Sequence, residues 1–261
     1  MKKFTQLIAS ALLLGSVSAN ATVIIFDGNN GGVNANIPGG TVETGMGTSV
    51  NSTDVVGDPL TFNDFVVTAG LGNTPAQGSS INFANSNFSV STHVNMDGRA
   101  VYQDVTPAHG GLGAWDGQNN NSDNLTPNQC SPSQCDEVLF FDFGVDTVLN
   151  TVWFNGNHTE LTSFTDNSGN DVGDTLFNIY FSVDGDSFTR VFNSQQSPTM
   201  RDYLDTNATD AYRYWAVSAT GWNYNSGGYV EAISFSKVST PSAIVLMGLM
   251  FVGLAFKRSR K

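Results

Sequence analysis

Short apolar runs separated by turn-forming clusters most constrain the fold of this chain. From Val23 onward, β-branched and aromatic residues occur in short runs, and Gly, Asn, Asp and Ser gather between them. The 3.6-residue apolar period of an amphipathic helix is almost absent. Because such runs favour strands and such clusters favour turns, the pattern predicts an all-β domain. The architecture expected for it is a two-sheet antiparallel sandwich of jelly-roll type.

The expected strands are apolar runs bounded by turn residues. They are Val23 to Phe26, Leu60 to Thr68, Ser79 to Ala84, Phe88 to Val94, Ala100 to Val105, Glu137 to Phe143, Val148 to Phe154, Phe177 to Val183, Phe188 to Phe192, Tyr212 to Ala219 and Tyr229 to Val238. Asp97-Gly98 and Asp184-Gly185 are expected to form tight turns. Pro198 before Thr199 to Leu204 predicts one short helix. The stretch from His109 to Asp136 lacks a strand signal and is expected to be a long loop, which in a compact domain is usually functional.

The N-terminus carries the pattern of a secretory signal peptide. Lys2-Lys3, the apolar run from Leu7 to Val17, and Ala19-Asn20-Ala21 are its basic, hydrophobic and small-residue regions. Residues 1–21 are therefore expected to be removed, so that the mature chain begins at Thr22. Residues 22–238 then form the β domain, which is long enough for a substantial core.

The C-terminus combines a short apolar run with a basic cluster. Ala243 to Phe256 would span roughly 21 Å as a helix, which is less than the roughly 30 Å hydrocarbon core of a membrane. Lys257, Arg258, Arg260 and Lys261 follow it directly and favour retention on the cytoplasmic side. Residues 239–261 are thus expected to insert transiently in the inner membrane as a short transmembrane segment.

This C-terminal arrangement resembles the PEP-CTERM sorting signal of Gram-negative bacteria, in which a short Pro-containing motif precedes a hydrophobic helix and a basic cluster. Val238, Pro241 and Ser242 match its Val-Pro-Glu-Pro-Ser motif, whereas Ser239 and Thr240 replace the Pro-Glu pair. The resemblance implies the export machinery and an exosortase-type processing enzyme as partners. It also implies a cell-surface, outer-envelope or extracellular-matrix location and a role beside exopolysaccharide. An ordinary stop-transfer helix is the alternative.

The charge of the middle of the chain excludes one class of partner. Six of the eleven basic residues lie in the two terminal segments, which leaves five basic residues against all 23 acidic ones, a net charge of −18. Such a surface repels nucleic acid and anionic lipid. It is compatible with cations, with neutral glycans, or with solubility alone.

Cys130 and Cys135 are the only cysteines. In an exported chain a close pair of this kind predicts a disulfide. Closing so small a ring contributes only about 2 kcal/mol, so the disulfide is expected to clip one loop. A zinc site would need two further ligands, and His93, His109 and His158 are scattered.

A second resemblance concerns the domain itself. Phe141 to Gly144, Ser182 to Gly185, Tyr212 to Tyr214 and Tyr229 to Ile233 follow one another as in discoidin-type, galactose-binding-like jelly rolls. The resemblance implies the jelly-roll architecture. It carries over no binding residue, and the long-range disulfide of that family is missing.

Two oxygen-rich clusters have the composition of calcium sites, because calcium takes six to eight oxygen ligands from Asp, Asn and backbone carbonyls. The candidate ligands are Asp116, Asn119, Asn121 and Asp123 in the first cluster, with Asp136 and Glu137 nearby, and Asp166, Asn170, Asp171 and Asp174 in the second. The second lacks the Gly and Glu of an EF-type loop. Asx-turn chemistry explains both clusters without metal.

Glycan binding needs an exposed ring flanked by amides, since the ring supports the apolar face of a sugar and the amides bond its hydroxyls. Trp115 with Asn119, and Trp222 with Tyr224, have this composition in expected loops. Loop aromatics can equally cover a core. Trp153 and Trp215 lie in expected strands and are predicted to be buried.

Motifs for catalysis are missing from the sequence. There is no Gly-x-Ser-x-Gly elbow, phosphate-binding glycine loop or His-Glu-x-x-His pair, and nothing selects the two carboxylates of a glycosidase. The expected function is therefore that of an exported, non-catalytic protein associated with exopolysaccharide through glycan binding. A secreted hydrolase of matrix polysaccharide and a purely structural matrix protein are the alternatives.

Overall fold

The computed structural model describes residues 21–28, 37–72, 88–89, 99–105, 110–115, 125, 136–155, 176–193, 203–220 and 228–238. Every element in these ranges is a strand, which confirms the all-β prediction. In chain order the strands are β1 Thr22–Ile25, β2 Thr41–Val42, β3 Met46–Ser49, β4 Asp54–Thr61, β5 Val66–Gly72, β6 Phe88–Ser89, β7 Ala100–Asp104, β8 Gly111–Trp115, β9 Asp136–Asn155, β10 Leu176–Ser182, β11 Ser187–Asn193, β12 Tyr203–Asp205, β13 Tyr212–Thr220 and β14 Tyr229–Lys237.

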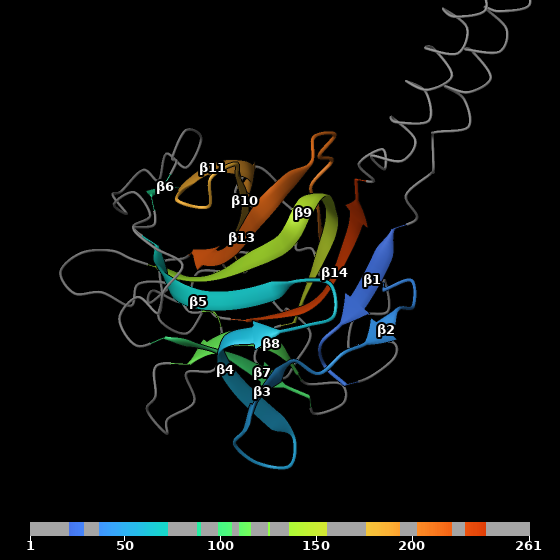
Figure 1. Cartoon of the computed structure of the whole chain (residues 1–261), viewed down its shortest axis with the longest axis vertical. Helices are drawn as coiled ribbons and strands as arrows, with labels where there is room; N and C mark the ends of the chain where they lie inside the picture. Colours follow the sequence, from blue (N-terminus) through green and yellow to red (C-terminus); the bar gives the residue numbers. More distant parts are fainter. Residues whose placement is uncertain are drawn as a thin grey trace, which may run out of the picture.

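Six of these strands close a barrel. The ring runs β14–β8–β7–β4–β5–β9 and returns to β14, and each neighbouring pair is antiparallel. β1 and β2 continue the sheet outward from β14, and β13, β10, β11 and β6 continue it from β9 (Figure 1). The expected two-sheet jelly-roll sandwich is not what the pairings give, because the described strands form one continuous sheet that curls and closes on itself.

The strand β9 explains this difference. Two strands were expected here, Glu137 to Phe143 and Val148 to Phe154, but β9 is one continuous strand that pairs differently on each side of Gly144. Its first half, Asp136 to Asp142, lies between β5 and β13, and its second half, Thr147 to Asn155, pairs with β14. Gly144 has φ 69°, and its N–H donates to the Asp142 carboxylate at 2.8 Å. The strand bends there and carries the sheet into the barrel.

Three other sequence-based assignments were wrong. The expected strand from Leu60 to Thr68 is broken by a turn in which the Phe62 N–H donates to the Phe65 carbonyl at 2.9 Å. The end of the expected helix is instead β12, which pairs with β9. The start of the expected long loop is β8, at the closing seam of the barrel.

β8 was not predicted because it is rich in glycine, and one of these glycines is required by the packing. A Cβ on Gly111 would lie 2.7 Å from both the Tyr229 Cβ and the Val230 carbonyl oxygen. Leu112 and Ala114, which alternate with the glycines, are fully buried. A strand that approaches its neighbour this closely needs glycine and gives little β signal.

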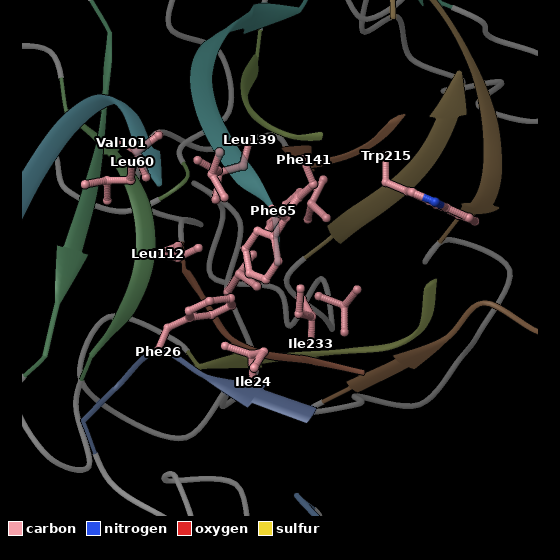
Figure 2. Packing of buried hydrophobic residues seen from close by; sticks show 14 of the residues in the cluster. Ile24, Phe26, Leu60, Phe65, Val101, Leu112, Leu139, Phe141, Trp215 and Ile233 are labelled. Carbon is pink, nitrogen blue, oxygen red and sulfur yellow. The ribbon is translucent and has the colours of Figure 1, made fainter. Parts of the chain in front are cut away.

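The barrel interior is filled with aromatic and branched side chains (Figure 2). Phe65 lies at the centre, with ring centroids 5.3 Å from Phe143, 5.8 Å from Phe235 and 6.0 Å from Phe141. Burying each such ring contributes about 2 kcal/mol. Trp215 is fully buried, and its indole N–H donates to the Thr147 and Tyr212 carbonyls, both at 3.0 Å. Trp153 is also buried, so both predicted core tryptophans are confirmed.

One buried amide side chain bonds three backbone groups of two segments inside the fold. The Gln103 Nε2 group donates to the Phe26 carbonyl at 3.0 Å and to the Glu43 carbonyl at 2.8 Å, and its Oε1 accepts from the Gly45 N–H at 2.7 Å. Gln103 is fully buried. It therefore satisfies backbone groups at the end of β1 and in the connection between β2 and β3, which no strand pairing reaches.

Replacing Gln103 with leucine should destabilise the domain strongly. Gln103→Leu keeps the volume but leaves three backbone groups without this partner, at about 1 kcal/mol each, so we expect a loss of about 3 kcal/mol. Asn150→Ala is the control, because it removes one half-buried bond to Ser236 and should cost less than about 1.5 kcal/mol. Urea unfolding measures both free energies, and equal losses would contradict this role for Gln103.

Candidate functional site

Most residues singled out from the sequence lie outside the described residues. Among them are both cysteines, Asn119, Trp222 and Tyr224, the eight candidate calcium ligands, and the sorting-motif residues after Val238. Val238 is exposed, and its N–H donates to the Asp146 carbonyl at 2.9 Å, so this residue is hydrogen-bonded to β9. Within the described ranges, no helix is long and apolar enough to cross a membrane.

Besides Val238, Trp115 and Glu137 also fall in described positions. Trp115 is the last residue of β8, where it is half-buried and pairs with Ala100, so it lies on a strand rather than in the expected loop. Glu137, near the first calcium cluster, is fully buried and accepts from the Arg99 Nε at 2.9 Å. No group of three or more potential metal-binding side chains occurs in the described part of the chain.

The structure instead forms a pocket on the outer face of the sheet, away from the barrel interior. It has a volume of about 170 Å³. The described residues that line it come from four strands: Val66 and Thr68 of β5, Phe140, Phe141 and Asp142 of β9, Tyr214 of β13, and Phe188 of β11. Register explains the grouping, because Val66, Asp142 and Tyr214 lie side by side across three strands. We call this the β9 pocket.

The hairpin of β10 and β11 closes one end of the β9 pocket. Phe140 and Phe188 are separated by three strand-to-strand steps, which would be about 14 Å on a flat sheet. Their ring centroids are only 5.4 Å apart. The hairpin therefore curls back over the sheet, and the small side chain of Ala216 lies in register between Phe140 and Tyr180, beneath it. Phe188 and Phe140 are both buried and form a closed apolar end.

The opposite end of the pocket is polar and open. The Asp142 carboxylate accepts from the Arg213 Nε at 2.7 Å and the Arg213 Nη2 at 2.8 Å, and both side chains are more than a third exposed. The hydrogen bond to Asp142 raises the pKa of Arg213. Its guanidinium also lies 4.8 Å from the Tyr214 ring centroid. The mouth thus presents a fixed carboxylate whose charge is largely balanced, beside a tyrosine ring.

Sequence reasoning missed the β9 pocket. Leu139, Phe141 and Phe143 alternate along the predicted strand Glu137 to Phe143, and all three are buried. The continuous apolar run Val138 to Phe141 carried a further signal, since a strand apolar on both faces is buried on both. Nothing in the sequence connects Phe140 with Phe188, because their approach depends on the curl of the hairpin.

No family model, curated protein or solved structure matches this chain.

A carboxylate-capped turn sets the position of Phe188. The Asp184 Oδ1 accepts from the N–H groups of Asp186 at 2.9 Å and Ser187 at 3.0 Å, and from the Ser182 hydroxyl at 2.9 Å. Gly185 adopts φ 83°, as expected for the Asp184-Gly185 turn. The hydrogen bonds from Ser187, Asp186 and Ser182 lower the pKa of Asp184 from 3.8 to about 2.

The turn should therefore keep its shape well into the acid range. Ionised Asp184 stabilises the turn fully above pH 3.8, and this contribution is lost only as the pH falls through about 2. The Ser187 amide chemical shift should stay nearly constant between pH 5 and 3 in an NMR titration. In Asp184→Asn, which has no carboxylate at this position, the change in the Ser187 amide shift caused by protonation of Asp184 should disappear. A midpoint near pH 3.8 in the unsubstituted protein would show that these bonds do not form.

Proposed function

We propose that the protein is an exported, non-catalytic component of an exopolysaccharide matrix that binds glycan through the β9 pocket. The observation that carries the proposal is the pairing of an aromatic end, Phe140 and Phe188, with a polar mouth, Asp142 and Tyr214. Aromatic rings support the C–H faces of sugars, and fixed polar groups orient a ligand in a mostly apolar site. Neutral glycan also suits a domain whose net charge repels polyanions.

The arrangement of carboxylates favours binding over hydrolysis. A glycosidase needs two carboxylates across the scissile bond, one of which is protonated. Asp142 is the one carboxylate among the described lining residues, and Arg213 holds it in a two-pronged ion pair. Such a pair favours the ionised form, which cannot donate a proton to a leaving group.

The C-terminal resemblance supplies the delivery part of the proposal. The export machinery and an exosortase-type enzyme would be processing partners, and the mature protein would lie at the cell surface, in the outer envelope or in the matrix of a Gram-negative bacterium. In this proposal the tail inserts only transiently in the inner membrane. The domain then meets polysaccharide outside the cell.

Binding to matrix polysaccharide tests the function. The protein purified from its host should cosediment saturably with the host's own exopolysaccharide, and we expect Tyr214→Ala to weaken binding about 10-fold, equivalent to about 1.4 kcal/mol. Tyr102→Ala is the matched control, because Tyr102 is a half-buried tyrosine on β7 that does not line the pocket. Runs with calcium and with a chelator test the calcium clusters. If the protein does not sediment with polysaccharide under either condition, the proposed function is wrong.

A further inference from the structure

The shape of the β9 pocket limits how a glycan can enter it. Phe188 closes the pocket at the end where Phe140 is buried, and Val66 and Thr68 of β5 line the side opposite Tyr214. The exposed groups, Asp142 and Arg213, lie together at the other end. A sugar inside a linear chain is bonded on two sides and needs a groove open at both. A pocket closed at one end accommodates a ring that is bonded on one side only.

The size of the pocket also favours a single sugar ring. Its volume of about 170 Å³ is below the roughly 300–1,000 Å³ of pockets that hold drug-sized ligands. A pocket below that range suits one six-membered ring better than a run of linked rings.

The chemistry of the walls selects the kind of ring. The rings of Phe140, Phe188 and Tyr214 offer apolar contact, and Thr68 and Asp142 add a hydroxyl and a carboxylate to the lining, which can bond sugar hydroxyls. A ligand that carries a carboxylate would place it next to the Asp142 carboxylate, whose charge Arg213 already balances. Like charges brought together at a partly enclosed site are unfavourable. A neutral sugar therefore fits better than a uronic acid.

We infer that the β9 pocket recognises chain ends: it binds one neutral sugar ring at the terminus of a polysaccharide chain and does not bind rings in the interior of the chain. This inference rests on the proposed function. It makes the protein a binder of glycan ends, so the number of binding sites on a polysaccharide depends on how many ends it has and not on its mass.

Random cleavage of the polysaccharide tests this inference directly, because it multiplies chain ends at constant mass. Partial acid hydrolysis and size fractionation of the host's exopolysaccharide give soluble fragments of decreasing mean length. Each fraction competes with immobilised intact polysaccharide for the purified protein. A 10-fold reduction in mean length should lower the half-inhibitory mass concentration about 10-fold. Fragments oxidised to uronic acids at the terminal ring should inhibit at least 10-fold more weakly than the neutral fragments.

Substitutions in the β9 pocket test whether inhibition by the fragments depends on binding there. Thr68→Val removes one hydroxyl at nearly constant shape and should weaken inhibition by every fraction, as should Tyr214→Ala, while Tyr102→Ala should leave the length dependence unchanged. If Tyr214→Ala does not fold, Thr68→Val still provides the comparison. Half-inhibitory mass concentrations that do not change with length would overturn end recognition but leave glycan binding intact. Failure of the protein to bind intact polysaccharide would overturn the proposed function instead.

Discussion

The structure depends on one strand, β9, whose two halves pair with different strands. The first half of β9 is paired on both edges, by β5 and β13, and its second half is paired by β14 and, over three residues, by β12. Hydrogen bonding of one continuous backbone to all four strands forces the sheet to bend where β9 bends, at Gly144. The bend brings β5 and β14 onto the same side, where β4, β7 and β8 connect them and close the barrel.

The same strand is buried on both faces, and the two faces have different roles. Leu139 and Phe141 point into the barrel interior, whereas Val138 and Phe140 pack under the curled hairpin of β10 and β11. The inner face supplies stability through the aromatic cluster around Phe65. The outer face supplies the floor of the β9 pocket. The candidate site is therefore built on the most extensively paired strand, which keeps its side chains in place better than a loop would.

The sequence predicted what depends on local pattern. The all-β class, the strands around Val23, Ala100, Tyr212 and Tyr229, and the burial of Trp153 and Trp215 follow from alternation and composition. The barrel could not be predicted from the sequence, because a turn that separates two strands at Gly144 and a bend within one strand at Gly144 have the same local signature. β8 was missed since its glycines, demanded by close approach to β14, carry no strand signal.

The candidate site was the least predictable part. Trp115 was chosen as a glycan contact from its polar neighbours in the sequence, yet it ends a barrel strand. The residues that do form a pocket come from β5, β9, β11 and β13, and only pairing register and the curl of the hairpin bring them together. Those are long-range properties, which composition and spacing do not encode.

Native-state hydrogen exchange of β9 is the most direct measurement of the central claim, that this strand makes the barrel and the pocket one cooperative unit. Hydrogen-bonded amides in the first half, near Phe141, and in the second half, near Val152, should exchange only through global unfolding, with opening free energies that agree within about 1 kcal/mol. If one half opened at a free energy several kcal/mol below the other, the two halves would belong to separate units, and the pocket would not share the stability of the barrel.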